Sequence, residues 1–139
     1  MKIYPTQLKF KKYQKFNSSF LCLNEQKKFY ITYMYGLKFL EAGFLTNPQL
    51  EACRKVIKRG VYKSNFYKID LFCSHPITQK TIASRMGKGK GNFKCWVKII
   101  NRGSINFQLA GLSQLLVKKI LLGIRGKLPF KTKIIKLVY

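Results

Sequence analysis

The 139 residues suit one domain with a tail, and an apolar fraction of 47% is enough to build a hydrophobic core. Twenty-eight lysines and arginines face four acids, and the formal charge of +24 opposes a compact fold unless a polyanion neutralises it. Membrane insertion is not expected, because two lysines interrupt the most apolar stretch, 112–124, which is also shorter than the about 20 residues of a span. The N-terminus lacks the apolar core of a secretory signal, which argues against a secreted protein that binds a sulfated polysaccharide. Nucleic acid is therefore the expected polyanion.

Residues 1–24 form a basic and aromatic arm without a helical or strand period. Its cations and rings are Lys9, Phe10, Lys11, Lys12, Tyr13, Lys15 and Phe16. A segment of this composition cannot form a core alone, so it is either a disordered tail or an extension that orders on a nucleic acid. The chain therefore divides into an arm, 1–24, and a single domain, 25–139.

The domain begins with a predicted strand and a predicted helix. Residues 29–35 are rich in β-forming side chains, and Gly36 breaks the pattern. Thr46 is the expected N-cap of the helix, since Pro48 falls in the first turn and Gln49 completes a capping box.

The helix has an apolar stripe and basic faces. The stripe, at helical spacing, consists of Leu50, Cys53, Ile57 and Val61. The other faces carry Arg54, Lys55, Lys58 and Arg59. Only Glu51 offsets these charges within the helix, so the basic faces are either solvated or in contact with RNA.

The second half of the domain predicts further strands and one more helix. Strands are expected at 66–73, 93–100, 105–109 and 131–138, with a long loop between the first two and lysines along the last, an edge strand. Alternation places Phe93, Cys95, Val97 and Ile99 on one face. The helix is expected to begin after Ser113 and to end at Gly126. Strands and helices do not alternate strictly, so the predicted fold is α+β, with a mostly antiparallel sheet and two helices packed on one face.

No residues are spaced for catalysis, and we expect no enzyme, no catalytic residue and no cofactor. The four acids, Glu25, Glu41, Glu51 and Asp70, form no pair suited to acid/base chemistry. His75 precedes Pro76 in an expected turn, without a Ser or Cys partner.

The four cysteines indicate neither a metal site nor a disulfide framework. They are Cys22, Cys53, Cys73 and Cys95, with no C-x-x-C spacing and a single histidine in the chain. We interpret them as small buried apolar residues in a reducing compartment.

The strongest local signal is a glycine-rich basic loop, Arg85-Met86-Gly87-Lys88-Gly89-Lys90-Gly91. Its glycines fall at every second position, which fits neither a Walker A loop nor G-x-G-x-x-G. Alternating glycines allow the backbone to pass close to another backbone, and the cations can contact phosphates. The loop is either a flexible surface loop or, as we prefer, an insertion into RNA.

The stretch 76–92, which contains this loop, closely resembles the signature of the L16 family of large-subunit ribosomal proteins. That family occurs in bacteria, mitochondria and plastids and is related to the archaeal and eukaryotic L10e proteins. Further matches keep the same order, at 9–12, 36–38, 45–54, 96–97 and 127–132. The resemblance covers about residues 5 to 137 and implies a compact α+β domain of the hammerhead type.

The resemblance implies a structural role in the large ribosomal subunit. Members bind rRNA near the A site and the peptidyl-transferase region, their glycine-rich loop approaches the A-site tRNA, and they support late subunit assembly. The implied partners are large-subunit rRNA, A-site tRNA and neighbouring ribosomal proteins, and no homo-oligomer is expected. The alternative is a free-standing RNA-binding protein or RNA chaperone.

The expected site residues combine those that the resemblance implies with further residues of the arm, helix and strands. The expected rRNA contacts are Lys9, Lys11, Lys12, Tyr13, Lys15, Lys38, Arg54, Lys55, Lys58, Arg59, Lys94, Lys127, Lys131 and Lys133. The expected A-site loop is Arg85, Met86, Gly87, Lys88, Gly89, Lys90 and Gly91. Two places depart from the family pattern: 17–20 replaces a stretch usually rich in Arg and Gly, and Phe44 stands where Arg is common.

Composition also suggests the origin of the chain. Sixty-five residues of Phe, Tyr, Met, Ile, Asn and Lys stand against 23 of Gly, Ala, Arg and Pro, and Lys outnumbers Arg 23 to 5. This is the bias of an AT-rich genome, and positions that keep Arg, such as Arg85, are those where its planar fork is needed. Without a cleavable presequence before the family match, a protein encoded in a mitochondrion is expected, with an AT-rich bacterium as the alternative.

Overall fold

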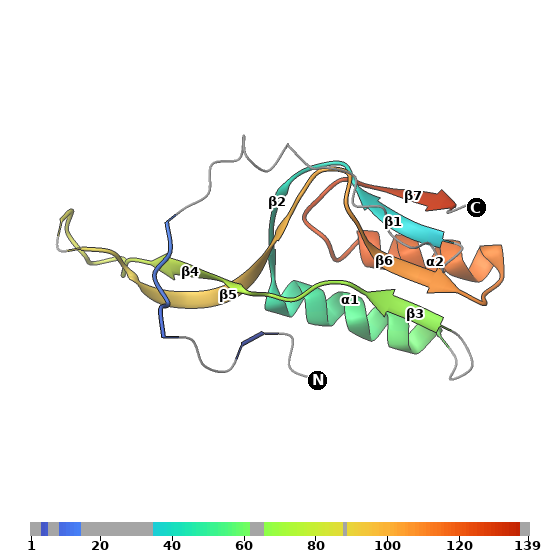
Figure 1. The fold of residues 1–139 in the computed structure, drawn as a ribbon, viewed down its shortest axis with the longest axis horizontal. Coiled ribbons are helices and arrows are strands. Elements are labelled where there is room, and N and C mark those ends of the chain that lie inside the picture. Colours follow the sequence, from blue (N-terminus) through green and yellow to red (C-terminus); the bar gives the residue numbers. More distant parts are fainter. Residues whose placement is uncertain (1–3, 6–8, 15–34, 62–65, 88, 137–139) are drawn as a thin grey trace.

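The computed structural model describes residues 4–5, 9–14, 35–61, 66–87 and 89–136. Within them, two helices and seven strands follow in the order β1, β2, α1, β3, β4, β5, β6, α2, β7 (Figure 1). The strand pairs are antiparallel. The α+β class predicted from the sequence is confirmed, and the strands form two sheets.

Helix α1 (Asn47–Gly60) begins where the capping pattern predicts. Oε1 of Gln49 accepts a hydrogen bond from the backbone N–H of Thr46 at 3.0 Å, which satisfies a donor that the helix leaves free. Val61 lies just beyond the helix and is half-buried. The buried residues of α1 are Leu50, Cys53 and Ile57, as the apolar stripe predicts.

Helix α2 (Gln114–Arg125) begins after Ser113 and ends at Gly126, also as predicted. It approaches α1 closely, because a Cβ built on Gly60 would lie 2.6 Å from Cγ1 of Ile120. The residues that α2 buries are Val117, Ile120, Leu121 and Ile124. They join the stripe of α1 in one hydrophobic core.

The larger sheet has four strands in the order β3-β6-β1-β7 and covers this core. Its strands are β1 (Tyr35–Phe39), β3 (Phe66–Ile69), β6 (Ile105–Ala110) and β7 (Thr132–Lys136). Alternation in β1 and β6 brings four side chains, all 0% exposed, into the core with both helices: Leu37, Phe39, Phe107 and Leu109. Strand β7 is an edge strand, as predicted.

The smaller sheet has the order β2-β5-β4 and continues into a hairpin that projects from the domain (Figure 1). Strand β2 (Gly43–Thr46) pairs with the inner end of β5 (Asn92–Ile100), and β4 (His75–Gln79) pairs with its outer part. The β4–β5 register shifts and leaves Lys94 as the extra residue of a bulge. The loop 80–91 therefore lies at the outer end of this hairpin, away from the core (Figure 1).

Several local predictions were wrong. Gly36 does not break a strand but lies inside β1, paired on both sides. Strand β2 was missed because four residues carry too little pattern. Residues 75–79 form β4 instead of loop, since Pro76 is compatible with an edge strand. Conversely, β3 ends at Ile69, so 70–73 are not part of it.

The expected buried face of β5 is only partly correct. Of that face Val97 is buried, Cys95 and Ile99 are half-buried and Phe93 is exposed, while Ile100, which was not expected on it, is buried. The reason is the hairpin itself, because the outer part of β5 leaves the domain and has no core to face. The expected strand residues 29–34 and 137–138 lie outside the described residues.

Candidate nucleic-acid interface

The loop 80–91 has a backbone braced by its own residues. The N–H of Ser84 donates to the carbonyl of Thr81 at 3.1 Å. Nζ of Lys80 donates to the carbonyl of Gly87 at 2.8 Å, across the loop. These bonds limit the conformations that the loop can take.

The glycines of this loop serve two different purposes. Gly87 and Gly89 have φ values of +90° and +79°, a backbone conformation that residues with a Cβ rarely adopt. A Cβ at either position would meet open space. A Cβ on Gly91 would lie 2.5 Å from the carbonyl carbon of Gln79. The close backbone approach that the glycine spacing suggested therefore occurs at Gly91, within the hairpin.

The charge of the hairpin has a single sign. Lys80, Arg85, Lys90 and Lys94 are exposed on it. Residues 71–139 contain no Asp or Glu, so no carboxylate of the hairpin offsets these cations. The surface is suited to contact phosphates. Lys88 lies outside the described residues.

Residues 9–14, called the strap here, lie across the hairpin (Figure 1). Nζ of Lys12 donates to the carbonyl of Lys90 at 3.3 Å, and Nζ of Lys90 donates to the carbonyl of Tyr13. This part of the expected arm is thus tied to the base of the glycine loop, and its cations add to those of the hairpin. Lys15 lies outside the described residues.

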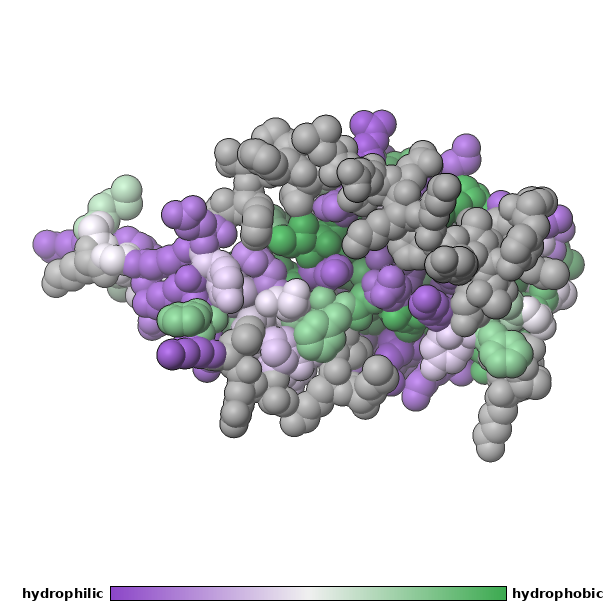
Figure 2. Space-filling view, in the orientation of Figure 1, coloured by the Kyte–Doolittle hydropathy of each residue, from purple (hydrophilic) through white to green (hydrophobic). Residues whose placement is uncertain are grey.

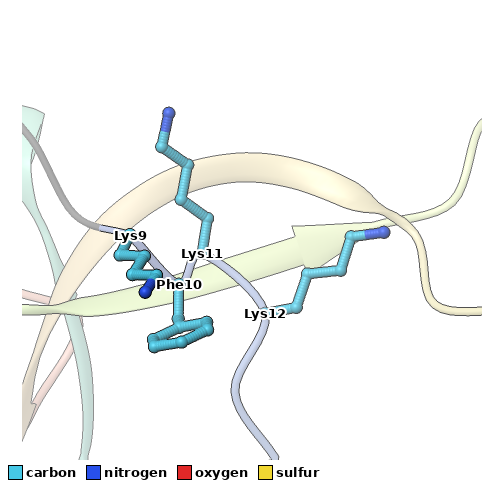
Figure 3. Close-up of a pocket in the computed structure, with 4 residues that line it drawn as sticks. All are labelled: Lys9, Phe10, Lys11 and Lys12. Carbon is cyan, nitrogen blue, oxygen red and sulfur yellow. The ribbon is translucent and has the colours of Figure 1, made fainter.

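Four residues of the strap, Lys9, Phe10, Lys11 and Lys12, line a pocket (Figure 3). Nζ of Lys9 lies 5.7 Å from the centre of the Phe10 ring, while Lys11 and Lys12 extend in different directions from the backbone. The ring is 66% exposed, so cations and an apolar face are presented side by side.

Three rings join the strap to both outer strands of the smaller sheet. The centroids of the Tyr13 and His75 rings are 5.8 Å apart, and Phe44 stacks on His75 with centroids 6.4 Å apart and planes at 16°. His75 is thus the first residue of β4 and packs between rings, which corrects its expected place in a turn. Burial and the charge of Lys90 lower the pKa of His75, which favours the neutral form of its ring. Phe44, a departure from the family pattern, has this packing role.

On helix α1 the four predicted cations are not equivalent. Arg54 is half-buried and forms an ion pair with Glu51, with Nη2 and Oε2 3.1 Å apart. Lys55, Lys58 and Arg59 are exposed, and the described part of the chain offers them no ion-pair partner. These three are better placed than Arg54 to contact phosphates.

A third group of predicted cations follows β1 and β7. Lys38 and Lys133 lie directly opposite each other in the sheet, where like charges repel. Lys131 is partly neutralised, since its Nζ lies 3.4 Å from Oε1 of Glu41. Lys127, after α2, is exposed.

The structure therefore brings the predicted residues together in three groups rather than one. The hairpin and strap form the densest group, and sequence reasoning missed the cation Lys80 and the packing role of Phe44. Lys80 stands within the glycine-loop signature and could have been included. The sequence marks Phe44 only as a departure from the family pattern, and its contact with His75 could not be predicted because it depends on strand pairing.

Other kinds of site find no support within the described residues. No three of their His, Cys, Asp or Glu side chains gather as a metal would require. None of their helices is long and apolar enough to span a membrane. Cys53 and Cys73 are buried, which raises the pKa of both thiols to about 11, as befits apolar core residues, whereas Cys22 is not described.

Comparison with known proteins identifies the family. The profile of the family described as "Ribosomal protein L16p/L10e" matches residues 5–135. The chain belongs to this family. It is accordingly a structural constituent of the large ribosomal subunit and serves in translation.

The relatives of this L16 chain include bacterial proteins named "Large ribosomal subunit protein uL16". The protein of Kosmotoga olearia is 43% identical over 101 residues, which are 73% of this chain and 72% of the relative. That of Carsonella ruddii is 39% identical over 135 residues, 96% of this chain and 98% of the relative. That of Buchnera aphidicola is 37% identical over 130 residues, 94% of this chain and 93% of the relative.

Proposed function

We propose that this L16 chain binds large-subunit rRNA near the A site and the peptidyl-transferase region, with loop 80–91 approaching the A-site tRNA. We further assign it a part in late subunit assembly, as a single copy beside neighbouring ribosomal proteins. The supporting observation is the acid-free hairpin with the strap across it. Its exposed, described cations are Lys9, Lys11, Lys12, Lys80, Arg85, Lys90 and Lys94.

The three groups of cations divide the work in this proposal. The strap, the exposed lysines of α1 and the β1–β7 edge contact rRNA phosphates and fix the orientation of the domain. The loop, at the far end of the hairpin, reaches beyond the core toward the functional centre. Lys15, Arg54, Lys88 and Lys127 remain in the proposed set.

A salt titration of binding to the chain's own protein-free large-subunit rRNA tests the proposal. If about 6–10 phosphates are neutralised, affinity falls roughly 10³- to 10⁵-fold between 50 and 200 mM salt. Replacing Lys9, Lys11 and Lys12 with Ala lowers the slope of log affinity against log salt by about 2–3, at roughly 0.7–0.9 per lost phosphate. Lys118→Ala, an exposed lysine of α2 outside the proposed set, is the matched control. A nearly flat salt response of the parent protein would refute RNA binding.

Sedimentation separates a ribosomal from a free-standing role. A tagged chain should migrate with large subunits and release from them only at high salt. A free-standing RNA-binding protein or chaperone would instead stay folded and soluble in the ribosome-free fraction.

The same fractions test the cellular setting. The AT-rich composition supports a mitochondrial ribosome, and it is equally compatible with an AT-rich bacterium, the setting that the bacterial relatives favour. Recovery in organellar ribosomes would support the first setting, and recovery in cytoplasmic ribosomes of a bacterium would exclude it.

A further inference from the structure

The outer end of the hairpin carries two apolar side chains that nothing covers within the described residues. Ile82 and Met86 are both fully exposed, more so than any other large apolar side chain that the structure describes. Figure 2 shows hydrophobic atoms at this outer end, beyond a largely hydrophilic stretch of the hairpin. Phosphate contacts alone do not account for them, because neither side chain can bind an anion.

The loop holds these side chains outward. The Thr81–Ser84 hydrogen bond closes the turn that contains Ile82, and the bond from Lys80 to Gly87 crosses the segment that contains Met86. The close contact of Gly91 with Gln79 fixes the base of the loop. A braced loop cannot easily fold its apolar side chains back onto the domain, so their exposure is part of its shape.

The surroundings of the two side chains define the partner. Arg85 lies between them in sequence and is exposed, and the hairpin carries no acid. The partner must therefore be anionic and must also present apolar faces. Unpaired nucleobases of an RNA meet both conditions, since their flat faces lie within a few ångströms of backbone phosphates.

We propose that Ile82 and Met86 pack against the faces of unpaired nucleobases while Arg85 contacts an adjacent phosphate or base edge. Met is well suited to this contact because its unbranched, polarisable side chain adapts to an aromatic surface. The inference rests on the proposed RNA binding and assigns to the loop a contact that does not depend on salt.

The test compares an Ile82→Ala/Met86→Ala double variant with the parent protein on its own protein-free large-subunit rRNA at several salt concentrations. The double variant should bind about tenfold more weakly at every salt concentration, with an unchanged salt slope, since apolar contacts with the bases are lost without loss of charge. Leu115→Ala is the matched control, because Leu115 is an exposed apolar residue (82%) on α2 and outside the hairpin. Its affinity should equal that of the parent.

Chemical probing of the rRNA supplies a second readout. A small number of unpaired bases should be protected by the parent and the Leu115→Ala control and become reactive with the double variant. Unchanged affinity and protection in the double variant would overturn the inference, even with a steep salt slope. So would normal binding to free rRNA combined with failure to join protein-containing subunits, because that result would assign the two side chains to a protein partner. A flat salt response of the parent would instead refute the proposed function itself.

Discussion

Gly91→Ala should open the outer end of the hairpin while leaving the core intact. The added Cβ would lie 2.5 Å from the carbonyl carbon of Gln79 and 2.6 Å from both its oxygen and the nitrogen of Lys80. Ordinary contacts begin near 3.4 Å, so two backbone segments must separate by nearly 1 Å. The separation breaks the Gln79↔Asn92 pair, the outermost of the β4–β5 ladder. We estimate a local cost of about 2–3 kcal/mol, from one or two lost hydrogen bonds and overpacking strain.

Amide hydrogen exchange measures this cost locally. A change of 2–3 kcal/mol raises exchange at the outer end of β4 and β5 roughly 30- to 150-fold. The β2–β5 pairs, at the inner end, serve as an internal control and should not change. Gly89→Ala is the matched variant, because its Cβ meets open space and only its φ of +79° is strained. It should cost about 1–2 kcal/mol in the loop itself and leave the ladder protected. Parental exchange in Gly91→Ala, or equal loss of protection in both variants, would refute the reasoning.

Three further predictions concern the strap, the loop and the core. Deleting residues 1–16 should leave the domain folded, since no residue of this segment belongs to the described core, yet it should lower incorporation into large subunits; an unfolded circular dichroism spectrum would contradict this. Arg85→Ala should leave subunits assembled but slow single-turnover peptide formation about tenfold or more, as expected for a lost charged hydrogen bond, whereas normal peptide formation with missing subunits would make the loop an assembly anchor. Burial raises the pKa of Cys53 from 9.0 to about 11. The contribution of this shift to the free energy of unfolding is therefore complete below pH 9 and is lost as the pH rises to 11. Urea unfolding of Cys53→Ala should therefore show a smaller decline over that range than the parent, and equal declines would exclude the effect.

The sequence predicted what depends on neighbours along the chain. Both helices begin where their N-caps indicate and α2 ends at Gly126 as predicted, because a cap is formed by residues within one turn. The longest strand and the strand after its turn were also located, since nine and six residues carry a readable pattern.

What the sequence could not predict depends on residues far apart. Strands β2 and β4 have four and five residues and exist as strands only because β5 pairs with both. The contact of Lys12 with Lys90 spans 78 residues, and no local pattern marks it. Arg54 was predicted as an rRNA contact, and its specific ion pair with Glu51, at i,i+3 spacing, was within reach of sequence reasoning.

Electrostatics links the fold of this L16 chain to its partner. Two of the four acids, Glu41 and Glu51, form ion pairs with cations, and the net charge of +24 is what remains after all four acids are counted. Two of the chain's cations, Lys38 and Lys133, lie directly opposite each other in the β1–β7 pair. Both are next in sequence to residues that pack in or against the core. Such an arrangement weakens the isolated domain, and a ligand that binds only the folded state restores the loss through its own binding free energy. A polyanion along the β1–β7 edge would stabilise this sheet pair by neutralising its lysines. The fold is therefore most stable when bound, as expected of a protein whose place is within a ribosomal subunit.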